Sequence, residues 1–459
     1  MSNDKNIKLQ SLREDILSLV REYGALKERK NIFIAGETPI PPSGKLLDEN
    51  EYINLVDASL DGWLTTGRFN DAFESKLADI LHVRHALTTN SGSSANLLAF
   101  ASLTSPRLGE RALKPGDEVI TVAAGFPTTV NPIIQYGCIP VFVDIELGTY
   151  NIDPKQIEAA VTLKTKAIML AHTLGNPFDI NAVLAIVKKY DLWLIEDSCD
   201  ALGAQYTVNI DYAKSRNDVI SAGESRAVGT FGHVGTLSFY PAHHITMGEG
   251  GAVFTNSKQL NTIAESFRDW GRDCYCPPGQ DNSCSKRFEW QLGELPKGYD
   301  HKYIYSHCGF NLKITDMQAA CGLAQLDKLD AFIKQRNENF AFMLDGLQAT
   351  QQHFILPYSS KDAVPSWFGF PITVISDKFT RLELVQYLDK KKIGTRQLFS
   401  GNIVRQPYMQ NVEYRQVGDL AATDKAMADT IWLGVQPSLG QVELTFVIQT
   451  IKQFIDSKN

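Results

Sequence analysis

Residues 235–251, GTLSFYPAHHITMGEGG, contain the strongest indication of the fold. An apolar run comes first, then a turn with two adjacent histidines, His243 and His244, and then a glycine-rich return to a second apolar run. Short apolar runs bounded by glycine and proline are typical of buried strands. The stretch therefore predicts two strands joined by a loop that carries histidine. Taken alone, such a histidine pair is more often structural or a metal ligand than catalytic.

Similar runs recur before this stretch, mostly separated by segments long enough for a crossover helix. Together they predict strands at 85–90, 118–124, 140–145, 167–172, 192–197, 236–240 and 251–255. This alternation predicts an α/β fold with a mainly parallel, seven-stranded sheet that is covered on both faces. Ligands of such sheets bind at the carboxyl ends of the strands.

The rest of the chain predicts three regions. Residues 1–45 form an amphipathic helix (about 9–30) and a proline-rich linker, residues 46–325 form the large domain, and residues 326–459 form a smaller C-terminal α+β domain. In the smaller domain we expect a strand near 368–375 and helices near 378–391 and 440–456. Two polar segments interrupt the large domain: 208–227, expected to be an outward surface loop, and the cysteine-rich insertion 272–300.

Composition narrows the class of partner. The chain has 459 residues, and 45 Lys+Arg against 52 Asp+Glu give a net charge of −7 without long blocks of either sign. This balance argues against nucleic acid or a membrane surface as the main partner. Without an apolar stretch of membrane-spanning length or a signal peptide, the protein is expected to be cytoplasmic, where thiols stay reduced. A cluster among its seven cysteines then suggests a metal.

Residues 88–95, TTNSGSSA, follow a predicted strand and open a helix at 94–101. Small residues there let backbone N–H groups and hydroxyls reach an anion at the positive end of the helix. A plain turn with a helix cap explains the same residues, so this segment alone is a weak phosphate signal.

Residues 194–203, LIEDSCDALG, end a predicted buried strand in two acids, Glu196 and Asp197. A carboxylate at the tip of a strand needs a partner, and a protonated pyridine nitrogen is one that a nearby aspartate maintains. A helix-capping aspartate is the alternative.

These segments in this order resemble the DegT/StrS family of pyridoxal-phosphate sugar aminotransferases over roughly residues 30–455. The matching stretches are NSGSSANLLAFASL, PVFVDIE, TYNIDPKQIEAA, KAIMLAHTLGNP, IEDSCDALGA, SFYPAHHITMGEGGAVFTN and GFNLKITDMQAACGLAQLDKL. The resemblance implies an aspartate-aminotransferase-like (fold type I) large domain and a homodimer with shared active sites. It also implies that Asp197 pairs with the pyridine nitrogen of the cofactor and that Phe126 stacks on its ring. The residues implied to hold the cofactor phosphate are Gly92, Ser93 and Ser238, together with Asn311 of the other subunit.

One position departs from the family pattern. Five residues after Ser238, where the aminotransferases carry the lysine that bonds to the cofactor aldehyde, this chain has His243. Imidazole forms no stable Schiff base, so ordinary transamination is disfavoured. Pyridoxamine phosphate (PMP) can instead condense with a substrate ketone through its own amine, while His243 removes a C4′ proton as general base. Loss of a hydroxyl then follows, which amounts to dehydration at C3 of a 4-keto sugar.

Four cysteines fit a metal centre. Cys274, Cys276 and Cys284 lie within eleven residues, and Cys199 lies two residues beyond Asp197. Four thiolates suit either a [2Fe–2S] cluster or a structural zinc ion, and spacing does not distinguish the two. Two residues of chain span at most ~7 Å, so a cluster that uses Cys199 lies within electron-transfer range of the cofactor.

Histidine in place of lysine, together with four cysteines, resembles the iron–sulfur dehydrases of this family. That resemblance implies CDP-4-keto-6-deoxyglucose as substrate and an NADH-dependent flavin and iron–sulfur reductase as partner, which supplies electrons through the cluster. The product would be a 3-deoxy-4-keto sugar for 3,6-dideoxyhexoses. A cluster-free dehydratase that ends in hydrolysis, and a non-catalytic cofactor-binding scaffold, remain as alternatives.

Arginines are the candidates for holding a nucleotide diphosphate, because their guanidinium forks suit phosphate. Arg268 and Arg272 precede the cysteine cluster, and Arg396 and Arg405 lie in GTRQLFSGNIVRQPYM, which also resembles the family. Arg405 is slightly favoured, with Arg396 next. A surface arginine without a ligand is the alternative for each.

Overall fold

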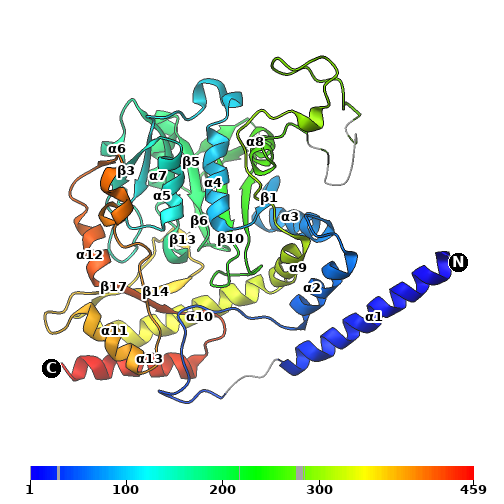
Figure 1. Cartoon of the computed structure of the whole chain (residues 1–459). Helices are drawn as coiled ribbons and strands as arrows, with labels where there is room; N and C mark the ends of the chain where they lie inside the picture. The colour runs from blue at the N-terminus through cyan, green and yellow to red at the C-terminus, as the bar shows by residue number, and fades with distance from the viewer. Residues whose placement is uncertain are drawn as a thin grey trace.

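A large twisted sheet forms the centre of the computed structural model, which describes residues 2–27, 32–216, 218–274, 276, 283 and 285–458. The strand order is β1-β11-β10-β5-β4-β2-β3-β16 (Figure 1). The strands are β1 (His85–Thr89), β2 (Glu118–Val122), β3 (Ile139–Val143), β4 (Thr165–Ala171), β5 (Trp193–Asp197), β10 (Val234–Ser238), β11 (Gly251–Thr255) and β16 (Arg415–Gln416). The seven predicted strands are confirmed. An eighth strand of two residues extends the edge, and only the pairings of β11 are antiparallel.

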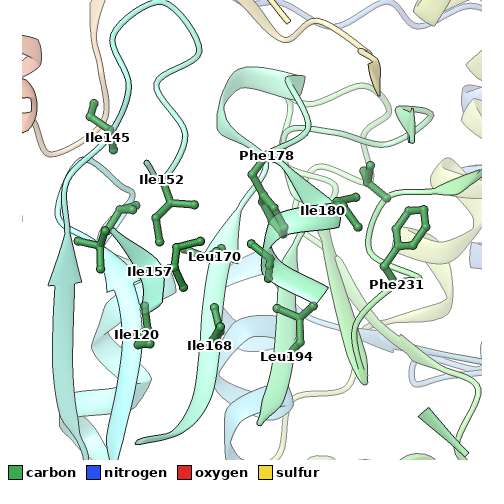
Figure 2. Packing of buried hydrophobic residues seen from close by; sticks show 14 of the residues in the cluster. Ile120, Ile145, Ile152, Ile157, Ile168, Leu170, Phe178, Ile180, Leu194 and Phe231 are labelled. Atoms are coloured by element: carbon green, nitrogen blue, oxygen red, sulfur yellow. The ribbon is translucent and has the colours of Figure 1, made fainter. Parts of the chain in front are cut away.

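Alternation along the central strands explains why both faces of the sheet are covered. In β4, Ile168 and Leu170 point to one face, whereas Ala167 and Met169 point to the other. The first face packs against α7 and neighbouring loops in a cluster that Figure 2 shows in part. The second face packs against α4 and α8. This double burial explains the uninterrupted apolar runs of the sequence.

The helices around this sheet are α2 (Glu49–Asp61), α3 (Arg68–Leu81), α4 (Gly92–Leu103), α5 (Pro127–Gln135), α6 (Ile157–Ala160), α7 (Ile180–Tyr190), α8 (Lys258–Arg268) and α9 (Asp316–Leu326), with 3₁₀ turns η1 (Pro106–Arg111), η2 (Thr173–Gly175) and η3 (His301–Tyr303). Helices α4 to α7 connect successive strands of this sheet, whereas α2 and α3 precede it and α8 and α9 follow β11 in the chain.

A second, smaller sheet has the order β12-β14-β17-β15 and its own apolar core. Its strands are β12 (Phe354–Ile355), β14 (Gly369–Val374), β15 (Arg396–Gln397) and β17 (Thr430–Gly434). The associated helices are α10 (Leu329–Leu347), α11 (Arg381–Lys390), α12 (Ala421–Asp429) and α13 (Gln441–Asp456), with η4 (Gln348–Thr350), η5 (Ile403–Arg405) and η6 (Pro407–Asn411). The expected strand and two helices are present. The proposed boundary at residue 326 stays a prediction, and Ile40 of the linker packs into this smaller core.

The N-terminal helix α1 (Ser2–Lys27) packs along α2. Arg13 bonds to Asp57 and Asp61 on α2. The predicted helix continued to residue 30, and residues 28–31 lie outside the described part. Within the described residues, we find no helix whose length and apolar character would let it span a membrane.

The segment 208–227 was expected to be an outward loop, and this expectation was wrong. It contains β7 (Tyr212–Ser215), β8 (Asp218–Ile220) and β9 (Ser225–Ala227), and β9 pairs with β6 (Gln205–Thr207), which in turn pairs with β13 (Ala363–Val364). Val208, Tyr212 and Ile220 are buried in the core of the large sheet. The few apolar residues of this polar segment are spaced to place one face inward, which periodicity over so short a stretch does not reveal.

Candidate active site

A cavity of about 950 Å³ lies where the carboxyl ends of β4, β5 and β10 face the smaller sheet. This volume is at the upper end of the range for small-molecule sites, roughly 300–1,000 Å³. Residues from both sheets line it, and so does Ser43 of the N-terminal linker. The position agrees with the rule for open α/β sheets.

One end of the cavity is built to hold an anion. Ser91 caps α4 by accepting a hydrogen bond from the Ser94 N–H, and Gly92 and Ser93 line the cavity in the first turn of the helix. A Cβ on Gly92 would lie 2.3 Å from the Cβ of Ser238, so only glycine lets Ser238 approach the helix N-terminus. Backbone donors, two serine hydroxyls and the positive end of α4 converge there, as a phosphate requires.

A buried carboxylate occupies the floor of the cavity. Asp197 Oδ2 accepts hydrogen bonds from Asn96 Nδ2 and Thr129 Oγ1, both at 2.7 Å, and Oδ1 accepts one from the Cys199 N–H at 3.1 Å. Asn96 is itself oriented by Thr236, which donates to Asn96 Oδ1. These donors are neutral, and a buried carboxylate is most stable beside a positive charge. A pyridinium nitrogen therefore fits the floor, and the serines at the α4 N-terminus fit the phosphate of the same cofactor.

His243 lies on the cavity wall and is mostly buried, with 15% of its side chain exposed. Burial lowers its pKa to about 4, although the Asp197 charge opposes this shift. Its Nδ1 lies 3.4 Å from Asp200 Oδ1, and burial together with the Asp197 charge raises the Asp200 pKa to about 8. At neutral pH the imidazole is thus neutral and the Asp200 carboxyl largely protonated. A neutral imidazole whose proton is on Nδ1, the nitrogen that faces Asp200 Oδ1, keeps Nε2 as the proton acceptor.

Hydrogen bonds from α10 hold the loop that carries His243 in place. Arg336 on α10 is almost fully buried, and its guanidinium donates to the His243 and Phe368 carbonyl oxygens, both at 3.2 Å. The Phe368 ring lies 5.3 Å from the imidazole ring, centroid to centroid. The neighbouring His244 is turned away from this cavity and contacts the Ser366 carbonyl through Nε2 at 3.0 Å. Of the two adjacent histidines, His243 therefore faces the cavity.

Phe126 precedes α5 and leaves about half of its surface, 52%, exposed at the cavity. Its ring meets that of Phe399, from the smaller sheet's side, edge to face at 6.3 Å. Asn311 is exposed and outside the lining of this chain's own cavity, and its Oδ1 accepts from Lys313 Nζ at 2.9 Å.

The predicted metal ligands do not all come together. The thiols of Cys274 and Cys276 lie with the His301 ring, with their ligand atoms within 4.8 Å of one another, whereas Cys284 is outside the described residues. Cys199 does not belong to this group. It lines the cavity, where burial raises the pKa of its thiol well above the usual value. His301 was not predicted, because nothing in the spacing of a lone histidine marks it as a neighbour of CYC.

The candidate arginines are divided in the same way. Arg396 lines the cavity, whereas Arg405 pairs with Asp424 outside it, Nε to Oδ1 at 2.9 Å. Arg268 is buried against Asp269, and Arg272 lies over the Trp270 ring. The structure therefore does not bring Arg405 to the cavity of its own chain. The family-like motif placed both arginines in one segment, and the turn at η5 separates them.

Asp200 and Arg381 are among the cavity-lining residues that sequence reasoning missed. Asp200 was part of the quoted IEDSCD segment but was not singled out, although an acid three residues after Asp197 could have been noticed. Arg381 begins α11, in a segment without a motif, and no sequence signal distinguishes it from a surface arginine.

A mainly parallel sheet with a smaller sheet closing over the carboxyl ends of its strands is the architecture of fold type I pyridoxal-phosphate enzymes. Residues 46–452 match the DegT/DnrJ/EryC1/StrS aminotransferase family, and the chain belongs to this family.

Two proteins and one solved structure are similar to this chain over most of its length. The chain is 59% identical over 445 residues to the lipopolysaccharide biosynthesis protein RfbH of Salmonella typhimurium, covering 97% of this chain and 98% of that protein. It is 50% identical to the dTDP-4-dehydro-2,6-dideoxy-D-glucose 3-dehydratase of Saccharopolyspora spinosa, over 96% of this chain and 92% of that protein. Among solved structures, the E. coli GDP-4-keto-6-deoxy-D-mannose-3-dehydratase with bound hydrated PLP superposes with a TM-score of 0.77 at 27% identity, covering 90% of this chain and 99% of that one.

Proposed function

We propose that this protein is a PMP-dependent dehydratase that removes the C3 hydroxyl of a nucleotide-linked 4-keto-6-deoxy sugar. The proposal rests on one observation about the cavity wall. His243 lines it, and none of the described residues that line it is a lysine. Without an amine, the cavity has no group that could bond covalently to the cofactor aldehyde. The names of the relatives, two of them sugar 3-dehydratases, support the same reaction class.

Bound PMP supplies an amine that condenses with the sugar ketone and a ring that accepts electrons. The protein's residues position these groups and move the proton. The α4 N-terminus with Ser93 and Ser238 holds the phosphate, Asp197 holds the pyridine nitrogen protonated, and Phe126 covers the ring. His243 is neutral above about pH 4, so it can accept the C4′ proton at physiological pH. Asp200 faces Nδ1 and fixes which imidazole nitrogen is available.

We further propose that CDP-4-keto-6-deoxyglucose is the substrate and that the protein acts as a CDP-4-keto-6-deoxyglucose 3-dehydrase. Its partner is then an NADH-dependent flavin and iron–sulfur reductase, and the product is the 3,6-dideoxy-4-keto sugar. This proposal rests on the four cysteines, Cys199, Cys274, Cys276 and Cys284, as ligands of a [2Fe–2S] cluster. Cys199 adjoins Asp197 and would connect the cluster to the cofactor.

One observation supports the alternative enzyme without an iron–sulfur cluster. Cys274 and Cys276 lie with His301 rather than with Cys199, and two thiolates with an imidazole also suit zinc. In that case the dehydrated sugar is hydrolysed without reduction, as in a GDP-4-keto-6-deoxymannose-type 3-dehydratase. The identity of the metal therefore distinguishes the two reactions, because an iron–sulfur cluster can transfer electrons to the dehydrated sugar and zinc cannot.

The homodimer with shared active sites is part of the same proposal. Asn311 lies on the surface, outside its own chain's cavity, where it is available to a second copy. We assign it to the cofactor phosphate of the partner subunit.

The test is analysis of iron, zinc and acid-labile sulfide in anaerobically purified protein, combined with product analysis of CDP- and GDP-linked 4-keto-6-deoxyhexoses incubated with PMP and a reductase. We expect two iron and two sulfide per chain and a 3-deoxy product from the CDP sugar. Zinc without sulfide would reject the redox reaction but keep the dehydration. If neither sugar loses its C3 hydroxyl, the dehydratase proposal itself is rejected.

A further inference from the structure

Arg381 is a cation of the cavity wall that no group in the described part of the chain neutralises. It lines the cavity, and within the described residues no carboxylate or carbonyl bonds to its guanidinium. Its Nε is buried from solvent and donates to no protein atom. A buried N–H without an acceptor is costly, so an acceptor from outside the protein is expected.

The position of Arg381 adds to this cost. It is the first residue of α11, and a positive charge is disfavoured at a helix N-terminus by the helix dipole. The acid of that first turn, Glu383, does not compensate, because it caps Thr380 and pairs with Lys458. An anion in the cavity would meet both the guanidinium and the positive end of α11.

A second guanidinium lines the same cavity from a different element. Arg396 on β15 is exposed, and its described bond is to the carbonyl of its own neighbour, Thr395, at 3.0 Å. Strand β15 is held by β17, where Arg396 pairs with Trp432. Arg405, by contrast, is neutralised by Asp424 outside the cavity. Of Arg381, Arg396 and Arg405, the two without a described carboxylate partner are thus the two that line the cavity.

Arg396 lies on a strand of the smaller sheet and Arg381 on helix α11, which packs with that sheet. The anion cradle at the α4 N-terminus lies beside the large sheet. The cradle already accounts for the phosphate of the cofactor. A second, more highly charged anion is therefore needed to explain Arg381 and Arg396, and guanidinium forks suit the oxygens of a diphosphate.

We infer that Arg381, assisted by Arg396, binds the diphosphate of the nucleotide-linked substrate. This inference rests on the proposed function for the class of substrate. It assigns the smaller sheet to substrate binding and the large sheet to the cofactor. The base of the nucleotide is not specified by these contacts.

The test measures binding rather than turnover. Calorimetric titration of PLP-loaded protein with CDP, GDP and dTDP, and with the corresponding nucleosides, is carried out for wild type, Arg381→Gln, Arg381→Lys and Arg396→Gln. Arg21→Gln, on the exposed side of α1, is the control with the same charge change. We expect Arg381→Gln to weaken the tightest-binding diphosphate by about 10- to 100-fold. Arg381→Lys should lose less because it keeps the charge, and nucleosides and the Arg21 control should be unaffected.

Separate titrations with PLP distinguish the two anions. The inference predicts wild-type PLP affinity in Arg381→Gln, with an unchanged melting temperature showing that the variant is folded. Wild-type nucleotide affinity in both Arg381 variants, or a loss confined to PLP, would overturn it while leaving the dehydratase proposal intact. If no nucleoside diphosphate binds even the wild type, the proposed substrate class fails together with the inference.

Discussion

The cavity and the cysteine-rich segment both carry candidate chemistry, but the protein builds them differently. In the cavity, Asp197 and Ser238 sit at the ends of adjacent parallel strands, and neutral hydrogen bonds hold Asp197 in place. In the segment 272–300, the described residues form turns and bends without a helix or a full strand. The sheet thus positions the cavity residues before any ligand binds. If Cys274 and Cys276 bind a metal as proposed, metal binding supplies part of the order around them.

The largest effect is expected for His243→Asn in the cavity. Removal of a general base costs typically 10²–10⁴-fold in rate, so exchange of the C4′ proton of PMP with solvent should fall by about that factor. Cofactor binding should persist because the cradle and Asp197 are unchanged. Deuterium exchange followed by NMR measures the rate, and equilibrium titration measures the affinity.

His82→Asn is the matched control for this variant. His82 is exposed at the end of α3 with φ +53°, a left-handed conformation that asparagine tolerates. Undiminished C4′ exchange in His243→Asn would remove His243 from the mechanism.

The next largest effect is expected for Cys276→Ser in the cysteine-rich segment. If the cysteine segment serves only electron transfer, this variant should keep C3 dehydration within about twofold and lose at least about tenfold of the reductase-coupled 3-deoxy product. Chromatography of both products from one incubation separates the two half-reactions. Cys321→Ser, a buried thiol on α9, is the control for the substitution itself. Equal loss of both half-reactions would mean that the thiols are structural.

A smaller effect is expected for Asp200→Asn, measured as the change of melting temperature with pH. The pKa of Asp200 is raised to about 8 in the folded protein from its ordinary 3.8, so the folded state binds this proton more tightly than the unfolded state. The resulting stabilisation is complete below about pH 4 and is lost as the pH rises to 8. Between pH 6 and 9 the melting temperature of the wild type should therefore fall by at least about 2 °C more than that of Asp200→Asn. Parallel melting curves for cofactor-free proteins would contradict the raised pKa.

The two regions also differ in what the sequence predicts. Strand runs and their ends located Asp197 and the turn with the two histidines, because the carboxyl ends of strands in one sheet meet at one edge. The family resemblance supplied Ser238 and singled out His243. Of the cavity wall that comes from the smaller sheet, only Arg396 was predicted. Arg381 reaches the cavity through the packing of two sheets, which depends on long-range contacts that no local pattern records.

Arg405 and His301 illustrate the same limit. Arg405 lies in a family-like motif, but a turn and the Asp424 carboxylate direct it elsewhere. His301 meets Cys274 and Cys276 across a segment without regular structure, so spacing along the chain does not report their proximity. In the segment 208–227, three apolar residues sufficed to bury one face.

Borohydride reduction of the PLP-loaded protein, followed by denaturation and mass spectrometry, shows whether any lysine bonds to the cofactor. His243→Lys is the positive control. The wild-type chain should keep its unmodified mass, whereas the lysine variant should retain the reduced cofactor. A wild-type chain that carries covalently attached pyridoxyl phosphate on a lysine would contradict the account.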